Sequence, residues 1–274
     1  AGENANNANI WVSSGSSLAS LFEINGTYQQ TANFSGAVGE TAPQCIQACD
    51  GEWYDDGTGP QIDICGECGG SCAYPDIIVP DDYSTIQQAL NSAVDGNVVY
   101  VRQGTYYENI NFNGKNISLI GEDRETTIIN GNNAGNVVTL HNFNYTEQTV
   151  IEKFTITNGQ EGISMQDAGS PSVKNCIIKN ISGGDDGGIY IAGDNRGSSP
   201  LIESCLIFNN SVTHDQGGGI RVASNNGNSS ATIINSTIVS NYPDGVHAYG
   251  TSVNVTNSII WNNPLTTSNN GNQA

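Results

Sequence analysis

The phrase VKNCIIKN at residues 173–180 recurs through the second half of the chain. Further copies read LIESCLIFN at 201–209, IINSTIVSN at 233–241 and VTNSIIWNN at 255–263, and a fainter one, IEKFTITN, lies at 151–158. Each copy alternates apolar and polar residues, which predicts a strand, and closes at an asparagine. These asparagines are 22, 29, 32 and 21 residues apart; they are Asn158, Asn180, Asn209, Asn241 and Asn262. A constant strand at unequal spacing indicates a solenoid whose loops vary in length.

Each copy is followed by a loop and then by a second apolar run that begins at glycine. The runs are EGISM from 161, GGIYIA from 187, GGGIRVA from 217 and DGVHAY from 244. Each coil therefore holds at least two strands, with Gly and Asn at the corners because both tolerate positive φ. Apolar residues then point inward and stack from coil to coil, and corner asparagines can form a hydrogen-bonded ladder. The predicted fold class is all-β, a parallel β-helix.

Four regions follow from this pattern. Residues 1–44 form a polar segment with strand-like runs at 9–13 and 18–25, and residues 45–74 are acidic and rich in cysteine. Residues 75–263 form the solenoid, and 264–274 a polar tail. The solenoid opens with a predicted helix that plugs the first coil. Ser84 is its expected N-cap, with Gln87 completing a capping box, and Gly96 ends it. Its apolar face consists of Ile86, Ala89, Leu90 and Ala93.

The solenoid region also resembles a known family. VPDDYSTIQQALNSAVDGNVVYVRQGTYYENINFNGKNISLIGE at 79–122, TTIINGNNAGNVVTL at 126–140 and the later NCIIKN–GGIYI repeats resemble secreted right-handed parallel β-helix proteins of the pectin-lyase-like superfamily. The resemblance covers 77–263. It implies the fold and leaves the function open, because this fold hosts lyases, hydrolases, adhesins and fibre proteins.

The run CDGEWYDDGTGPQIDICGECGGSC at 49–72 resembles short acidic Cys/Gly modules beside sorting domains of secreted bacterial proteins. That resemblance implies calcium binding by alternating carboxylates, here Asp50, Asp55, Asp56 and Asp63. A plain acidic linker held by disulfides is the alternative, and zinc fits less well because the paired CxxC spacing is missing. Two distant cysteines occupy equivalent repeat positions and should stack in the core, as a disulfide or as free thiols. The disulfide candidates are Cys45, Cys49, Cys65, Cys68, Cys72, Cys176 and Cys205.

The chain has 8 Lys and Arg against 27 Asp and Glu, a net charge of −19. Such a balance argues against a nucleic-acid partner, which needs a basic stripe, and suits divalent cations or simply solubility. No apolar run reaches the ~20 residues of a membrane span. The opening AGENANNANI is typical of a mature terminus after cleavage, so we expect a secreted or cell-surface protein.

An acidic residue stands between the closing asparagine and the glycine-led strand in four successive repeats. If the coils stack in register, these acids line one edge at about 4.8 Å intervals and repel one another. A calcium ion would relieve the repulsion. The alternative is a solvated acidic edge without metal. The acids are Glu161, Asp185, Asp186, Asp215 and Asp244.

Catalytic motifs are sparse. The resemblance would imply an Asp pair with Gly-His-Gly and Arg-x-Lys in a polysaccharide hydrolase, yet only the pair Asp185–Asp186 is present. Arg196 and Arg221 lie in no recognisable lyase motif. The three histidines, His141, His214 and His247, are interpreted as surface or loop residues. The sequence therefore favours a non-enzymatic role and predicts no catalytic residues.

The two ends of the solenoid suggest self-assembly. SIIWNNP at 258–264 runs straight into the polar tail, which leaves an open edge, while the N-terminal segment holds spare strands. Head-to-tail addition would give a fibre, sheath or surface-layer filament. Milder readings are that the spare strands pack on their own coil, or that the chain is a fragment. The residues predicted to assemble are Ile10, Trp11, Val12, Leu21, Ile259, Ile260 and Trp261.

A second function fits the same fold: a carbohydrate-binding or polysaccharide-degrading β-helix that uses its acidic edge or exposed tyrosines. The candidates for sugar contact are Tyr190, Tyr242 and Tyr249. As the chain is expected to be secreted, its N-x-S/T sequons also make it a possible glycoprotein. The glycosylation candidates are Asn25, Asn33, Asn144 and Asn228.

Overall fold

The structure is a computed structural model that describes residues 75–193, 197–213, 217–224 and 229–264 and the backbone of two short strands before them. The chain divides into two compact units, Ala1–Gln61 and Ile62–Ala274. In the first unit, β1 (Ile46–Gln47) pairs antiparallel with β2 (Trp53–Tyr54). The described residues of the second unit hold the solenoid.

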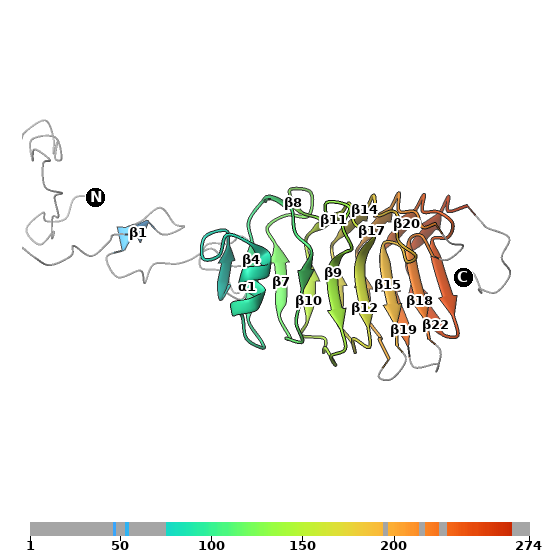
Figure 1. The fold of residues 1–274 in the computed structure, drawn as a ribbon, viewed down its shortest axis with the longest axis horizontal. Helices are drawn as coiled ribbons and strands as arrows, with labels where there is room; N and C mark the ends of the chain where they lie inside the picture. Colours follow the sequence, from blue (N-terminus) through green and yellow to red (C-terminus); the bar gives the residue numbers. More distant parts are fainter. Residues whose placement is uncertain are drawn as a thin grey trace, which may run out of the picture. The chain divides into compact units, whose positions relative to one another are not determined.

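The solenoid is a right-handed parallel β-helix, which confirms the predicted fold class (Figure 1). Its described strands form three parallel sheets of eight, seven and six members. Sheet 1 consists of β3 (Ile77–Val79), β4 (Val98–Val101), β7 (Ser118–Gly121), β10 (Val150–Glu152), β13 (Ser172–Lys174), β16 (Leu201–Glu203), β19 (Ser230–Ile234) and β22 (Ser252–Thr256). Sheet 2 consists of β5 (Gly104–Tyr106), β8 (Thr127–Asn130), β11 (Thr155–Thr157), β14 (Ile177–Lys179), β17 (Leu206–Phe208), β20 (Thr237–Val239) and β23 (Ile259–Trp261). Sheet 3 consists of β6 (Ile110–Asn111), β9 (Asn136–His141), β12 (Glu161–Gln166), β15 (Ile189–Ala192), β18 (Ile220–Ala223) and β21 (Val246–Tyr249).

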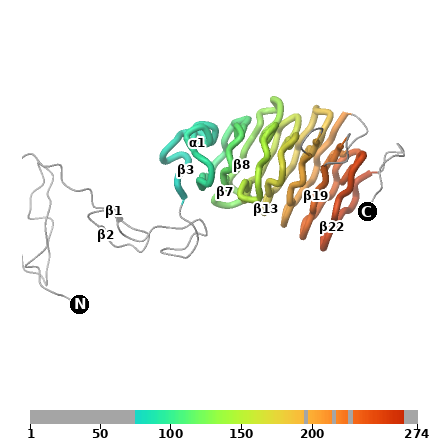
Figure 2. The backbone as a smooth tube through the Cα atoms, turned by 90° about the horizontal axis from the view of Figure 1, so that it is seen from below, coloured from blue at the N-terminus to red at the C-terminus, as the bar shows by residue number. Residues whose placement is uncertain are grey.

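Successive coils stack as layers from β3 to β22 (Figure 2). The chain passes through sheet 1, sheet 2 and sheet 3 in turn, and each strand pairs with its equivalent in the next coil. Loop length varies freely under this constraint: Val98 pairs with Ser118, 20 residues on, and Ser118 pairs with Val150, 32 residues on. The unequal repeat spacing read from the sequence is thus explained by loops outside a constant set of strands.

The interior is filled by columns of stacked apolar side chains, one of which consists of isoleucine alone. The middle strand position of sheet 2 is isoleucine in six consecutive coils, and the first five of these side chains are fully buried. Burying one such side chain contributes about 1.5–3 kcal/mol, so the column is a main source of stability. Its members are Ile129, Ile156, Ile178, Ile207, Ile238 and, at the end of the described solenoid, Ile260.

The asparagine corner between sheets 2 and 3 is confirmed, with one shift in register. Four of the five predicted asparagines adopt positive φ there: Asn158, Asn180, Asn209 and Asn262. In the remaining coil Ser240 adopts the positive φ, so placing Asn241 at this corner was wrong. The serine can stand there because its small side chain crowds the left-handed conformation little.

Asn241 instead belongs to a buried ladder one position further on. The Nδ2 of Asn210 donates to the Oδ1 of Asn241 at 3.0 Å, and the Nδ2 of Asn241 donates to the Oδ1 of Asn263 at 3.1 Å. The Oδ1 of each side chain in this ladder also accepts a backbone N–H from the coil before it. The Oδ1 of Asn241, for example, accepts the N–H of Asn210 at 3.1 Å. The expected asparagine ladder therefore exists. A second, exposed rung joins Asn209 to Asn180 at 2.6 Å.

Glycines at the start of the sheet 3 strands serve close packing and not the positive φ that the sequence suggested. None of four equivalent glycines has a positive φ. A Cβ placed on any of them would overlap atoms of the following coil, in three cases a backbone carbonyl oxygen. Two neighbouring coils can approach at this corner only without side chains. The four are Gly162, Gly188, Gly219 and Gly245.

The predicted helix is present as α1 (Ile86–Ser92), and its apolar face is buried in the core as expected. The N-cap is Thr85 and not Ser84, since the Thr85 side chain accepts the N–H of Gln88 at 3.2 Å. Glu108 binds the first helical N–H groups, those of Ile86 and Gln87, both at 2.9 Å. The helix ends at Ser92, before Gly96, and covers the interior beside β3, β4 and β6. No helix among the described residues is long and apolar enough to span a membrane.

Candidate functional site

Three of the predicted acids lie at one corner of the described solenoid. Glu161 begins β12, and Asp186 and Asp244 stand just before β15 and β21, so all three share the corner that leads into sheet 3. When the register of these strands is extended to the corner, Asp244 is equivalent to Glu161 and Asp186 lies one position earlier. Asp185 is exposed, and Asp215 lies outside the described residues. The acids nevertheless have different partners, and two of them form a distinct cluster.

Glu161 forms the first half of this cluster with Ser164. Burial raises the pKa of the Glu161 carboxyl; the hydrogen bond with Ser164 acts in the opposite direction. The Ser164 hydroxyl also lies 2.9 Å from Nε2 of His141, whose pKa is lowered by burial, so the imidazole is neutral at neutral pH. Ser164 is fully buried and cannot reach a polymer as a nucleophile. Its role in this geometry is to position the glutamate.

Asp186 forms the second half. Asp186 as a whole is only 8% exposed, and its carboxylate accepts a hydrogen bond from Nη1 of Arg221 in the next coil. The guanidinium of Arg221 also lies over the ring of Tyr190, 5.4 Å from its centroid, a cation–π contact. Burial raises the pKa of Asp186, although the charge and hydrogen bond of Arg221 act to lower it. Asp186 and Arg221 also act electrostatically on Glu161, so the two halves are one unit.

We call Glu161, Ser164, Asp186 and Arg221 the carboxyl cluster. Within the described part of the chain, two side-chain polar atoms are buried without a hydrogen-bond partner, and both belong to this cluster. They are Oε2 of Glu161 and Nε of Arg221. Folded proteins rarely leave such atoms unpaired, because each costs about 1–3 kcal/mol. Unpaired polar groups with shifted pKa values are typical of functional sites.

A row of residues on the side of sheet 3 away from the core runs through the cluster; Ser164 is covered and the other four residues are half-buried. Strand pairing places Thr139, Ser164, Tyr190, Arg221 and His247 opposite one another in five consecutive coils. Of the two positions expected for His141 and His247, surface or loop, the loop is excluded. Both stand on sheet 3 strands with half-buried side chains. Nδ1 of His247 lies 3.2 Å from Asp244.

Calcium binding stays a prediction. Among the described residues, no three His, Cys, Asp or Glu side chains converge as a metal site requires. Asp186 and Asp244 instead contact Arg221 and His247. The other predicted ligands, Asp50, Asp55, Asp56, Asp63 and Asp215, lie outside the described residues.

The remaining predicted site residues are distributed as follows. Cys176 and Cys205 stack in the core as free, buried thiols, and burial raises the pKa of Cys205 to about 12. Asn144 is exposed, as a glycosylation acceptor must be. The rest lie outside the described residues: Cys45, Cys49, Cys65, Cys68, Cys72, Asn25, Asn33, Asn228, Ile10, Trp11, Val12 and Leu21.

The similarity of this chain to known proteins is limited to its fold. No protein-family model and no curated protein matches the chain. Among solved structures, it is similar to a pectin methylesterase variant in complex with a hexasaccharide, at 14% identity and a TM-score of 0.41, over 65% of this chain and 67% of that one. It is also similar to pectin methylesterase from carrot, at 15% identity and a TM-score of 0.39, over 73% and 90% of the two chains. Similarity at this level carries no inference about substrate or activity.

Replacing Glu161 with Gln is expected to stabilise the fold at neutral pH by about 1 kcal/mol, because an amide avoids the cost of burying a charge. The raised pKa of Glu161 means that the native state loses stability as pH rises above the ordinary glutamate value of 4.5. The gain should therefore vanish in acid, below that value. Thermal unfolding of both proteins between pH 3.5 and 7.5 measures it. The exposed Glu147→Gln change is the control, and a loss of stability at neutral pH would contradict the expectation.

Proposed function

We propose that the protein binds and cleaves polysaccharide on the outer face of sheet 3, with Glu161 and Asp186 as the acid–base pair. The observation that carries this proposal is the pair of buried, partnerless atoms in the carboxyl cluster. One is a carboxyl oxygen and the other a guanidinium N–H; both are covered in this structure, so the proposal requires their side chains to turn outward, where together they offer a bound hydroxyl or glycosidic oxygen both kinds of hydrogen bond.

The two carboxyls are suited to different roles. Hydrolysis of a glycosidic bond needs one carboxyl that is protonated and one that is ionised. Glu161 has no direct cation partner in the cluster and has its pKa raised by burial, so it is the proton donor. Asp186 is ion-paired with Arg221, which opposes the rise in pKa that burial causes and favours the carboxylate, so we assign it as the base or nucleophile. Ser164 holds Glu161 in place, and neutral His141 supports Ser164.

The surface around the cluster suits an extended polymer. The row on the outer side of sheet 3 crosses five coils, and neighbouring strands lie about 4.8 Å apart, so its four partly exposed residues offer contacts along a line. It carries hydroxyl, aromatic, guanidinium and imidazole groups, which bind sugar hydroxyls and ring faces. With a net charge of −19, the protein repels strongly anionic chains, so a neutral or weakly charged polysaccharide fits best.

The test is release of new reducing ends from a panel of neutral and uronic-acid polysaccharides by the full chain. We expect cleavage of at least one neutral polymer, and a fall in kcat of about 100-fold or more in both Glu161→Gln and Asp186→Asn. Glu147→Gln, which changes an exposed loop carboxylate, should keep full activity. The proposal fails if no polymer in the panel is cleaved, or if Glu161→Gln cleaves as fast as the unchanged protein.

A further inference from the structure

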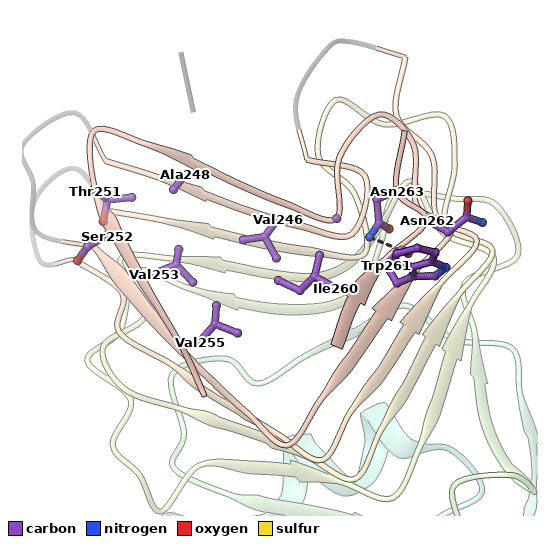
Figure 3. A pocket seen from close by; sticks show the side chains of 11 residues that line it. Val246, Ala248, Thr251, Ser252, Val253, Val255, Ile260, Trp261, Asn262 and Asn263 are labelled. Carbon is purple, nitrogen blue, oxygen red and sulfur yellow. Dashed lines mark hydrogen bonds between the residues drawn. The ribbon is translucent and has the colours of Figure 1, made fainter. Parts of the chain in front are cut away.

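The C-terminal end of the described solenoid exposes its interior. Figure 3 shows Val246, Val253, Val255 and Ile260 pointing into the last coil, and they line a hollow of about 360 Å³. These side chains are partly exposed, whereas their equivalents one coil earlier, such as Ile238, are fully buried. On the outer side, Ile259 and Trp261 are 61% and 73% exposed. The residues at this end are apolar, as core residues are, but they are partly exposed.

Strand edges are open at the same place. β22, β23 and β21 are the last members of sheets 1, 2 and 3. The N–H of Ile259 donates backward to Ser236 at 2.9 Å, and successive residues of a parallel strand point to alternate sides. The N–H and C=O of Ile260 therefore point forward, where a further strand would pair. Open edges of this kind are templates for strand addition.

The opposite end of the solenoid is not a suitable partner for direct stacking. There α1 packs beside β3, β4 and β6 and buries Ile86, Ala89 and Leu90 in the core. Two solenoids joined end to end would therefore place a helix where β23 requires a strand. An occupant of the open edge must instead be an extended segment with an apolar residue at the Ile260 position.

Such a segment is present near the N-terminus. NANIW at residues 7–11 matches NSIIW at 257–261 in three of five positions, including the Asn, Ile and Trp. We propose that residues 7–11 of a second copy add to β23 as a further strand of sheet 2. Ile10 then pairs with Ile260 and extends the isoleucine column, and Trp11 lies beside the exposed Trp261. The N–H of Ile260 donates to the carbonyl of Asn9, and Trp11 donates back to the Ile260 carbonyl.

The corner positions define how far this match extends. Asn7 falls at the corner of Asn257, which has positive φ and donates to the Oδ1 of Asn235 at 2.6 Å. Val12 falls at the corner of Asn262, where φ is positive and a β-branched residue is strained. The segment thus supplies one strand and then leaves the coil.

A second copy fits better than the other candidate occupants. The tail after Pro264 reads LTTSNNGNQA and has one large apolar residue, so it lacks the alternating pattern of a strand. Binding of the same chain's own residues 7–11 would leave the protein monomeric, and the test below distinguishes this case. A contact between the N-terminal segment of one copy and the C-terminal coil of the next is heterologous and extends into a filament.

The test uses two single variants of the full chain. Ile10→Asp removes the donor strand's apolar residue without touching the solenoid, and Ile260→Lys places a charge at the open edge, where its ammonium reaches solvent. We expect the unchanged protein to form concentration-dependent oligomers in sedimentation velocity and filaments by electron microscopy. Each variant alone should associate at least about 100-fold more weakly than the unchanged protein. Ile10→Val is the conservative control and should still assemble.

Mixing the two variants gives the decisive readout. The Ile10→Asp protein keeps its acceptor edge and the Ile260→Lys protein keeps its donor segment, so the mixture should form a one-to-one dimer and nothing larger. Unchanged melting curves for both variants show that the solenoid is intact. A monomeric unchanged protein, which would mean that its own segment or tail covers the edge, overturns the proposal. Filaments of either variant alone, or a mixture that stays monomeric, do so as well.

Discussion

Gly219→Ala is expected to destabilise the solenoid by about 3 kcal/mol or more. A Cβ at this position would overlap the carbonyl oxygen of Gly245 in the next coil and press on Asn241 and Ile238. The carbonyl of Gly245 cannot retreat, because it accepts the N–H of Ile220 at 2.9 Å, and Gly219 itself is hydrogen-bonded to Asp244 and to Ile189, each at 3.0 Å. Overpacking normally costs about 1–3 kcal/mol, and a rigid backbone neighbour places this change at or beyond the upper limit. Urea unfolding followed by circular dichroism measures the loss.

A matched control separates packing from backbone conformation. Gly135 has a positive φ of 59° but open space around its Cβ position. Asn tolerates that φ, so Gly135→Asn should change stability by less than about 0.5 kcal/mol. If Gly219→Ala were equally mild, the coils would be able to separate at this corner. The explanation of the glycine column by close packing would then be wrong.

The fold was readable from the sequence because each coil repeats the same physical requirements. Alternating apolar residues and the asparagine corner recur in every copy of VKNCIIKN, and both follow from one strand and one turn. One error is repeated in four coils, the positive φ expected at the equivalent glycines before sheet 3, and two others concern single positions. Asn241 was placed at the corner that Ser240 occupies, because both residues of Ser-Asn can form a turn. The helix cap shifted from Ser84 to Thr85, since either hydroxyl could have accepted the N–H of a first-turn residue.

The acidic edge was also predicted, but the carboxyl cluster was not. The sequence shows that acids recur before sheet 3, and the strand pairing confirms that they share one corner. It does not show that Arg221 reaches back over Tyr190 to Asp186, a residue 35 positions earlier. That contact depends on the strand register between coils and on rotamers, which no local pattern encodes. A usable signal was present in the aligned runs GGIYIA and GGGIRVA, which place Tyr and Arg at equivalent positions.

The cluster and the open edge are both exceptions to the rule that the rest of the solenoid obeys. Elsewhere the coils bury apolar columns and pair their polar groups in ladders. Glu161 and Arg221 keep buried atoms unpaired, and the last coil keeps apolar side chains exposed. Each exception lowers stability, and features that lower stability without a structural benefit are the usual places of function. For this reason we place activity on sheet 3 and association at β23, as two separable proposals.

Arg221→Met is expected to cost about 3 kcal/mol at neutral pH. The change removes the cation that faces Asp186 while leaving a carboxylate of which the side chain is 11% exposed, and a buried charge without its partner is strongly destabilising. The pKa of Asp186, already raised by burial, must rise further once Arg221 no longer opposes the effect. Below the ordinary aspartate value of 3.8 the carboxyl is neutral in folded and unfolded chains alike, so the loss should fall there to about 0.5–1 kcal/mol, the contribution of the cation–π contact with Tyr190. The loss of stability should grow as pH rises towards the pKa of Asp186 in the folded variant, and it should stay constant above that pKa.

The double change Arg221→Met with Asp186→Asn identifies the cause. It removes both charges, so most of the lost stability should return at neutral pH. A residual loss of about 0.5–1 kcal/mol is expected because the cation–π contact with Tyr190 is gone in both proteins. Thermal unfolding of the four proteins of the cycle between pH 3 and 8 gives the coupling directly. A loss in Arg221→Met that is the same at pH 3 and pH 7, and that Asp186→Asn does not rescue, would mean that Arg221 stabilises the coil by packing alone. In that case Asp186 would not be held as a charged group, and its assignment as the ionised partner of Glu161 would fail with it.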